Sequence, residues 1–190
     1  MKKIILFGDS LFNGYRAGHD TNVITAGVQK EFVGQAQISN LSLSGATTAQ
    51  GRQRLNLIPT DSDIVVLEYG TNDMSTGWGI SSAEYAANLN DMVKSIGASK
   101  MIIVGPAYED PNNKYIMQYY NHQNMTIYNQ IAIDCARKYN IPFINLIANF
   151  CQLKNLSSYY QEDGQHLTAA GNQILINLVV AAIKQKLAQL

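Results

Sequence analysis

The chain has 190 residues, of which 46% are hydrophobic and 15% are charged. This length fits one domain of ordinary size, and this composition excludes a disordered chain. Lysine plus arginine and aspartate plus glutamate both number 14, so the formal net charge is zero. We therefore expect no nucleic acid partner and no polybasic membrane surface, whereas a neutral surface permits self-association into a homo-oligomer.

The N-terminal segment and the two cysteines favour a cytoplasmic protein. The first apolar run covers only residues 4–7 before Asp9 closes it, whereas a secretory signal needs about 7–15 apolar residues. No stretch approaches the roughly 20 apolar residues of a membrane span, so we expect no stable membrane insertion. Cys135 and Cys151 form no CxxC pair, and we interpret both as buried thiols in a reducing compartment.

Five short apolar runs predict β-strands. Most are rich in isoleucine and valine and do not alternate with polar residues, which is typical of strands that are buried on both faces. In chain order they are Lys3–Gly8, Ala36–Leu41, Ile64–Tyr69, Met101–Val104 and Pro142–Leu146.

Helical patterns lie between the later strands. Apolar spacings of three and four predict helices around residues 89–96, 127–136 and 174–183, and a further helix is expected between Thr48 and Leu57. A capping box of Ser81 and Glu84 is expected in front of the first of these stripes. Alternating strands and helices predict an α/β fold, with a parallel sheet covered by helices on both faces and one domain over residues 1–190. The long irregular stretch 107–124 is a candidate lid or dimer contact.

Short polar turns that contain glycine follow the first three predicted strands. Because ligands bind at the carboxyl ends of parallel strands, these turns are the first place to look for chemistry. Ser10 follows the first strand as a candidate nucleophile with an exposed hydroxyl. The backbone N–H groups of Ser10 and Gly45 and the side-chain amide of Asn72 could together hold an oxyanion.

A candidate base precedes the last predicted helix. His166 follows Asp163 by three residues, with Gly164 between them. A turn at that glycine would fold the carboxylate back onto the imidazole, which is the contact that an acyl-transfer triad needs. Alone, this spacing is equally typical of a helix-entry loop with a surface histidine.

Taken together, these blocks resemble the GDSL family of esterases and lipases, also called SGNH hydrolases. Residues 8–11 read Gly-Asp-Ser-Leu, residues 40–47 are similar to the second block, residues 70–73 read Gly-Thr-Asn-Asp, and residues 163–166 read Asp-Gly-Gln-His. The resemblance spans residues 4 to 171. Four blocks in the right order make it specific, although each block alone is weak.

The resemblance implies a fold and a mechanism. The fold would be a flavodoxin-like three-layer α/β/α sandwich with about five parallel strands. Ser10 would attack the carbonyl of a small-molecule ester, His166 would take the serine proton, and Asp163 would orient the imidazole. Ser10, Gly45 and Asn72 would form the oxyanion hole, and no metal or cofactor would be needed. A compact chain favours acetyl or short- to medium-chain acyl esters. Some members have proline after the histidine, and Leu167 stands there instead.

Other functions stay open at this stage. The chain could be a catalytically silent flavodoxin-like binding or regulatory domain. A nucleotide-binding enzyme is disfavoured, because neither GxGxxG nor GxxxxGK[ST] occurs. A metal-dependent phosphoesterase could use Asp9, Asp163 and His166 as ligands, and chelator sensitivity would distinguish it. Trp78 could line an acyl pocket or be a packed surface aromatic. Glu68 is expected inside a central strand, where an unpartnered carboxylate is unfavourable.

Overall fold

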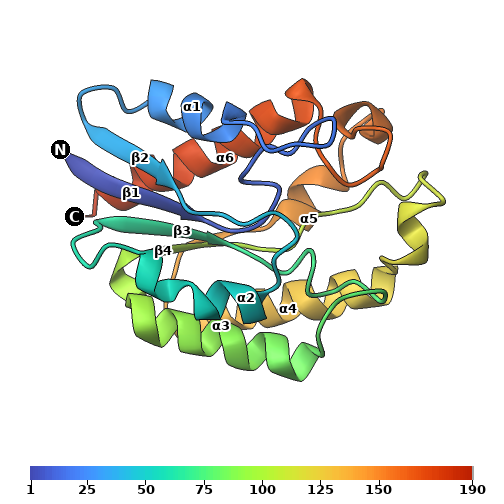
Figure 1. Cartoon of the computed structure of the whole chain (residues 1–190), viewed down its shortest axis with the longest axis horizontal. Helices are drawn as coiled ribbons and strands as arrows, with labels where there is room; N and C mark the ends of the chain where they lie inside the picture. Colours follow the sequence, from blue (N-terminus) through green and yellow to red (C-terminus); the bar gives the residue numbers. More distant parts are fainter. Residues whose placement is uncertain (190) are drawn as a thin grey trace.

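A five-stranded, all-parallel sheet forms the centre of the molecule (Figure 1). The computed structural model describes residues 1–189. The sheet order is β2-β1-β3-β4-β5. In chain order the strands are β1 (Lys2–Phe7), β2 (Ala36–Asn40), β3 (Ile64–Glu68), β4 (Met101–Val104) and β5 (Phe143–Ile144).

The central strands are apolar on both faces because helices cover both faces. Every residue of β3 is buried, and so is every residue of β4. Alternate residues of β1 point to opposite sides, so Leu6 joins one hydrophobic cluster and Phe7 joins the other. This explains why the strand sequences lack polar alternation, and it confirms the predicted α/β fold.

Two layers of helices enclose the sheet (Figure 1). Helices α1 (Val23–Lys30) and α6 (Ala169–Leu187) cover one face, and α2 (Thr48–Gln53), α3 (Ser82–Ile96) and α4 (His122–Lys138) cover the other. The short helix α5 (Leu146–Phe150) follows β5 directly. Four 3₁₀ turns complete the regular structure: η1 (Leu55–Leu57), η2 (Ala98–Lys100), η3 (Ile116–Gln118) and η4 (Leu156–Tyr159).

Several local predictions need correction. Cys151 is exposed rather than buried, because it follows the short α5 at the surface, while Cys135 is buried as expected. The capping of α3 is simpler than predicted, since the Ser81 hydroxyl accepts the Glu84 N–H without a reciprocal bond among residues 1–189. The helix expected between Thr48 and Leu57 divides into α2 and η1.

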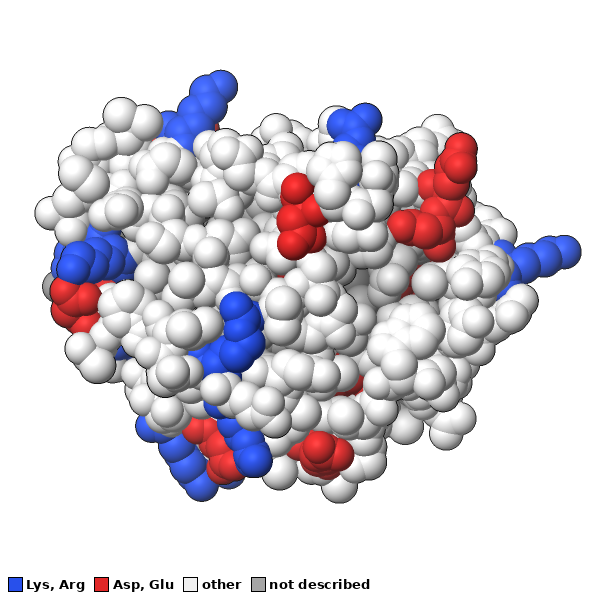
Figure 2. Space-filling model, in the orientation of Figure 1, with Lys and Arg blue, Asp and Glu red and all other residues white. Residues whose placement is uncertain are grey.

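The described residues include no membrane-spanning helix, and no strongly charged patch stands out on the face seen in Figure 2. Within residues 1–189 no helix has both the length and the apolar character that crossing a bilayer requires. Figure 2 shows basic and acidic side chains interspersed over one face, with wide uncharged areas between them. This distribution matches the formal net charge of zero.

Candidate active site

Ser10, His166 and Asp163 form a continuous hydrogen-bonded chain. The Ser10 Oγ lies 2.9 Å from His166 Nε2, and His166 Nδ1 lies 2.7 Å from Asp163 Oδ2. Ser10 follows β1, whereas the other two residues lie in the loop between η4 and α6. The fold therefore brings together side chains that are 156 positions apart in the sequence.

The partners of His166 determine which nitrogen carries its proton. An ionised carboxylate can only accept, so Nδ1 donates to Asp163 and Nε2 is left as an acceptor for the Ser10 hydroxyl. Burial tends to raise the pKa of Asp163, but hydrogen bonds from the His166 ring and from the Gln165 and His166 N–H groups outweigh it, and the pKa is lowered. The carboxylate is thus ionised beside the imidazole at neutral pH.

The loop that carries the histidine has a tightly specified shape. Gly164 has a φ of +74°, a left-handed conformation that favours glycine, and a Cβ there would lie 2.6 Å from Asn113. The Asp163 Oδ1 accepts the backbone N–H of both Gln165 and His166 at 2.9 Å. This turn folds the carboxylate back onto the ring, as the Asp-Gly-Gln-His spacing predicted.

Two backbone N–H groups near the serine are free to donate. Among residues 1–189, no protein acceptor takes the N–H of Ser10 or of Gly45. Gly45 has a φ of +77° and no atom near the position of a Cβ. Both residues line the same pocket as His166. The arrangement provides two donors close to the Ser10 hydroxyl.

The side chain of Asn72 is held on three sides. Its Nδ2 donates to Asp9 Oδ2 at 3.0 Å and to the Ala46 carbonyl at 3.2 Å. Its Oδ1 accepts from the Trp78 indole N–H at 3.4 Å. With a carboxylate on one end and an N–H donor on the other, the amide has only one satisfactory orientation, with Nδ2 toward Asp9 and Ala46.

Four carboxyl groups with no exposed surface lie behind this edge of the sheet: Asp9, Glu68, Asp73 and Glu109. Burial raises the pKa of Asp9 to about 6, although hydrogen bonds, first that from the Leu11 N–H, partly offset the effect. Burial and the neighbouring Asp9 charge raise the pKa of Glu68 well above its usual range. Because the Asp9 N–H donates to Glu68 Oε2 at 3.1 Å, Glu68 has the partner that the sequence did not reveal.

The other two carboxyls differ in how they are held. Asp73 accepts bonds from the Thr48 N–H and hydroxyl, so it anchors the start of α2 to the turn after β3. Burial raises the pKa of Asp73 to about 6. Neither oxygen of Glu109 has a hydrogen-bond partner among residues 1–189. Its burial, and then the charges of Asp9 and Asp163, raise its pKa well above the usual range.

An open pocket of about 400 Å³ surrounds the serine. Tyr15 packs on the His166 ring with centroids 4.6 Å apart, and Trp78 forms another wall. Ser44 and Gln165 also line it, and the sequence did not single out either of these two as a functional residue. Both fall inside the four sequence blocks, which is the signal that could have identified them.

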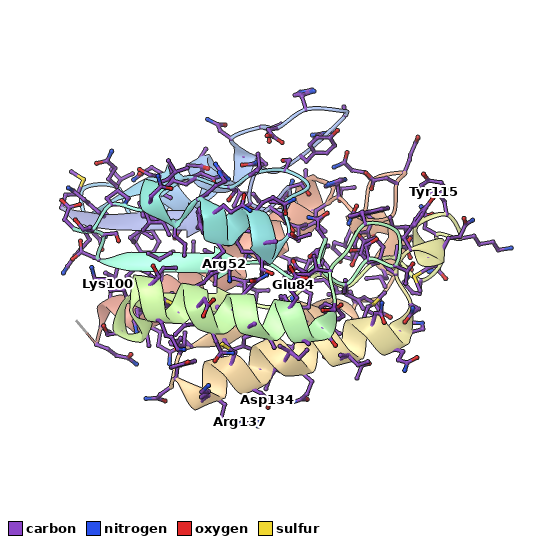
Figure 3. All side chains as sticks on the ribbon, turned by 60° about the horizontal axis from the view of Figure 1, so that its bottom comes forward. Arg52, Glu84, Lys100, Tyr115, Asp134 and Arg137 are labelled. Carbon is purple, nitrogen blue, oxygen red and sulfur yellow. The ribbon has the colours of Figure 1, made fainter. Side chains whose placement is uncertain are left out.

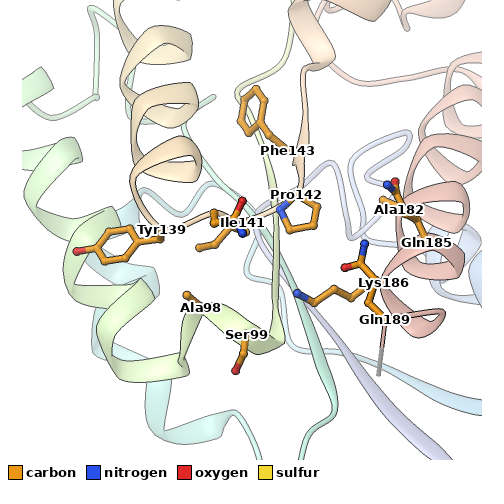
Figure 4. A pocket seen from close by; sticks show the side chains of 11 residues that line it. Ala98, Ser99, Tyr139, Ile141, Pro142, Phe143, Ala182, Gln185, Lys186 and Gln189 are labelled. Atoms are coloured by element: carbon orange, nitrogen blue, oxygen red, sulfur yellow. The ribbon is translucent and has the colours of Figure 1, made fainter.

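A second cavity lies at the opposite end of the sheet. It has a volume of about 790 Å³ and is lined by the C-terminal turns of α4 and α6, including Tyr139 and Lys186 (Figure 4). Of the residues that the sequence analysis singled out, none lines it. Within the described chain no cluster of three or more His, Cys, Asp or Glu side chains is arranged to hold a metal ion. Asp9, Asp163 and His166 therefore do not form the metal site considered as an alternative.

Comparisons with known proteins agree with this architecture. A crystal structure of a lipase/acylhydrolase from Enterococcus faecalis matches with a TM-score of 0.90 and 29% identity, covering 98% of this chain and 97% of that one. A carbohydrate acetylesterase from Sinorhizobium meliloti matches with a TM-score of 0.78 and 17% identity, covering 97% and 99%. A protein named TesA gives a TM-score of 0.78 at 22% identity, with the same coverage. The latter two show a shared fold.

Sequence comparison identifies the family. No curated protein sequence matches the chain significantly. The model of the GDSL-like lipase/acylhydrolase family matches residues 6–174, which include all four sequence blocks from Ser10 to His166. The chain therefore belongs to the GDSL-like lipase/acylhydrolase family and is a hydrolase that acts on ester bonds.

Proposed function

We propose that the protein hydrolyses carboxylic esters of acetyl or short- to medium-chain acyl groups through a Ser10–His166–Asp163 triad. The observation that carries the proposal is the unbroken chain from the Ser10 hydroxyl through the imidazole to the carboxylate, at 2.9 and 2.7 Å. A serine hydroxyl is a weak nucleophile and needs such a base. The family membership and the lipase/acylhydrolase neighbour support an ester as the substrate.

The reaction proceeds in two halves. Ser10 Oγ attacks the ester carbonyl carbon while its proton passes to His166 Nε2, and the carbonyl oxygen becomes an oxyanion. The imidazolium then protonates the departing alkoxide, so that an alcohol leaves and the acyl group stays on Ser10. A water molecule gives a proton to the same nitrogen as it attacks the acyl carbon. The acid then leaves, and the proton returns to Ser10.

The oxyanion is held by three donors. The N–H groups of Ser10 and Gly45 have no competing protein acceptor in the described chain. Asn72 supplies the third, because the Nδ2–H that donates to the Ala46 carbonyl over the longer distance of 3.2 Å can be shared with the oxyanion. The shorter bond to Asp9 keeps the amide in place meanwhile. Preorganised donors of this kind are worth most in the transition state.

The proposal is tested with p-nitrophenyl acetate, butyrate and octanoate, each with and without EDTA. Ser10→Ala should lower kcat at least ~10³-fold while leaving the fold intact. Ser44→Ala is the matched control, because this second serine of the pocket donates its hydroxyl to Asp20 at 2.5 Å rather than to a histidine. Turnover should resist the chelator and decline from acetate to octanoate. Near-normal turnover by Ser10→Ala would eliminate Ser10 as the nucleophile, and no turnover on any ester would favour the silent binding domain.

A further inference from the structure

Trp78 presents an exposed aromatic face at the catalytic pocket. Trp78 is the single tryptophan of the chain, and 48% of its surface is exposed. Its ring is fixed from behind by Tyr119, with centroids 5.0 Å apart, and by the edge of Tyr120 at 5.9 Å. A large aromatic side chain that is held firmly yet left uncovered beside a nucleophile is a preformed binding surface.

The rest of the pocket is polar or aromatic. Tyr15 forms a second aromatic wall on His166, and the remaining lining includes the hydroxyl of Ser44 and the amide of Gln165. The lining contains no aliphatic side chain and no lysine or arginine. A fatty chain would find no apolar channel here, and a phosphate or carboxylate would find no cationic side chain except a protonated His166. The surface instead suits an uncharged ring that carries hydroxyl groups.

The space for the acyl part is small. A separate apolar cavity is lined by Leu11 and Leu167, the sequence neighbours of the serine and the histidine, and by Phe150. Its volume of about 10 Å³ would hold at most about one water molecule. An acetyl group can fit in the open pocket beside Ser10, whereas a long acyl chain has no enclosed space to enter. The acyl end of the substrate is therefore short.

We propose that the alcohol part of the substrate is a neutral sugar ring that stacks on Trp78, so that the enzyme removes acetyl groups from carbohydrate. The C–H groups on one face of a pyranose are weakly positive and are attracted to the negative face of an indole. The hydroxyl and amide groups at the rim of the pocket can bind the sugar hydroxyls. This inference rests on the proposed esterase function and adds the substrate class to it.

Tyr115 marks the outer limit of the aromatic surface. It packs edge-on against Tyr119 with centroids 5.7 Å apart, and it is 63% exposed. Figure 3 shows Tyr115 on the segment before α4, projecting from the end of the molecule opposite Lys100. Because Tyr119 separates it from Trp78, a single sugar ring on Trp78 does not reach Tyr115. Tyr115→Ala is therefore a suitable control for the loss of an exposed aromatic side chain.

Fluorescence tests the binding step without any catalysis. Because Trp78 is the single tryptophan, its emission reports on this site alone. Titration with methyl β-xylopyranoside or methyl β-glucopyranoside should change that emission and reach saturation, in the wild type and in Tyr115→Ala. Cyclohexylmethanol, an apolar ring, and sodium octanoate should have little effect. A response to either of these but to neither pyranoside, or no response to any of the four, would overturn the inference.

Kinetics separate stacking from the Trp78–Asn72 hydrogen bond. Both Trp78→Phe and Trp78→Ala lose the indole N–H, but only the alanine variant loses the ring. Relative to Trp78→Phe, Trp78→Ala should raise KM about five- to tenfold for an acetylated methyl pyranoside and raise it less for ethyl acetate. Tyr115→Ala should hydrolyse both esters as the wild type does. Equal losses on both esters would refute the stacking role. Pyranoside binding without hydrolysis of any ester would instead refute the proposed function and keep the sugar site.

Discussion

The Asp9 carboxylate and the Asn72 amide are joined by a buried hydrogen bond of 3.0 Å. Asp9 is fully buried next to the nucleophile, and its other oxygen accepts the Leu11 N–H at 3.0 Å. One carboxylate therefore fixes both the backbone after Ser10 and the Asn72 side chain, which we propose as an oxyanion donor. We infer that Asp9 is a positioning residue, which acts through Asn72 and touches no substrate atom.

Asp9→Asn should lower kcat about tenfold and leave KM nearly unchanged, since the amide would satisfy only one of the two donors that the carboxylate accepts. This loss is smaller than the ~10²–10³ expected when an oxyanion donor is removed outright. The pH dependence of kcat separates the effect of the Asp9 charge from a purely structural effect of the substitution. The pKa of Asp9 is raised to about 6, so the wild type itself loses the charge in acid.

The ratio of wild-type to Asp9→Asn activity should therefore shrink as the pH falls from about 8 to about 5. Steady-state kcat over that range, with circular dichroism to check the fold, is the measurement. A ratio that stays constant with pH would show that the charge on Asp9 has no part in catalysis.

Asn72→Ala should lower kcat by ~10²–10³ with little change in KM, because the amide acts on the transition state rather than on the bound ester. Stopped-flow measurement of acyl-enzyme formation from p-nitrophenyl acetate would locate the loss in the acylation step. The variant also removes an acceptor for the Trp78 indole N–H. An effect on KM alone would remove Asn72 from the oxyanion hole.

Glu109→Gln should stabilise the protein more strongly as the pH rises. The pKa of Glu109 is raised in the folded state, so ionisation favours the unfolded chain once the pH passes the ordinary glutamate value. The variant removes this penalty. It should match the wild type near about pH 5 and exceed it near about pH 8 by on the order of 1 kcal/mol, or ~2–4 °C in Tm. Thermal unfolding at both pH values tests this, and an equal difference at both would contradict it.

Gly8→Ala should destabilise the fold by about 1–3 kcal/mol. A Cβ at Gly8 would lie 2.6 Å from the backbone carbonyl of Glu68, so β1 and β3 would have to separate just before the nucleophile. Gly34→Ala is the control, because it has a φ of +73° but open space around it, and its expected loss is about 1 kcal/mol. Urea unfolding compares the two, and similar losses would argue against the steric explanation.

The sequence predicted the sheet well because the strand signal was strong. The buried runs at β1 and β4 had no polar interruption and that at β3 had only Glu68, and their ends were placed within two residues. Helix α1 (Val23–Lys30) was not predicted because only Ile24 and Val28 in it are buried, which is too few for a clear stripe. Strand β5 is only two residues long, shorter than the predicted Pro142–Leu146, because Pro142 has no backbone N–H to donate and Asn145 already caps α5.

The residues of the candidate site could be predicted from the sequence, but the hydrogen bonds that hold them could not. The blocks around Ser10, Asn72 and His166 pointed to one edge of the sheet, and the structure brings their side chains together there. The partners of Asn72 could not be predicted, because Asp9 and Trp78 bind it through tertiary contacts that local spacing does not encode. For the same reason Glu109 gave no signal, since nothing in its neighbourhood along the chain marks it as buried.

The distance of 156 positions between Ser10 and His166 also bears on how the protein is made. Ser10 therefore leaves the ribosome well before the loop with Asp163 and His166. That loop is positioned by α6 (Ala169–Leu187), which packs beside α1. In the proposed mechanism, a nascent chain therefore gains esterase activity only when α6 docks. In a refolding experiment, the rate at which turnover returns would therefore report the docking of α6 rather than the formation of the sheet.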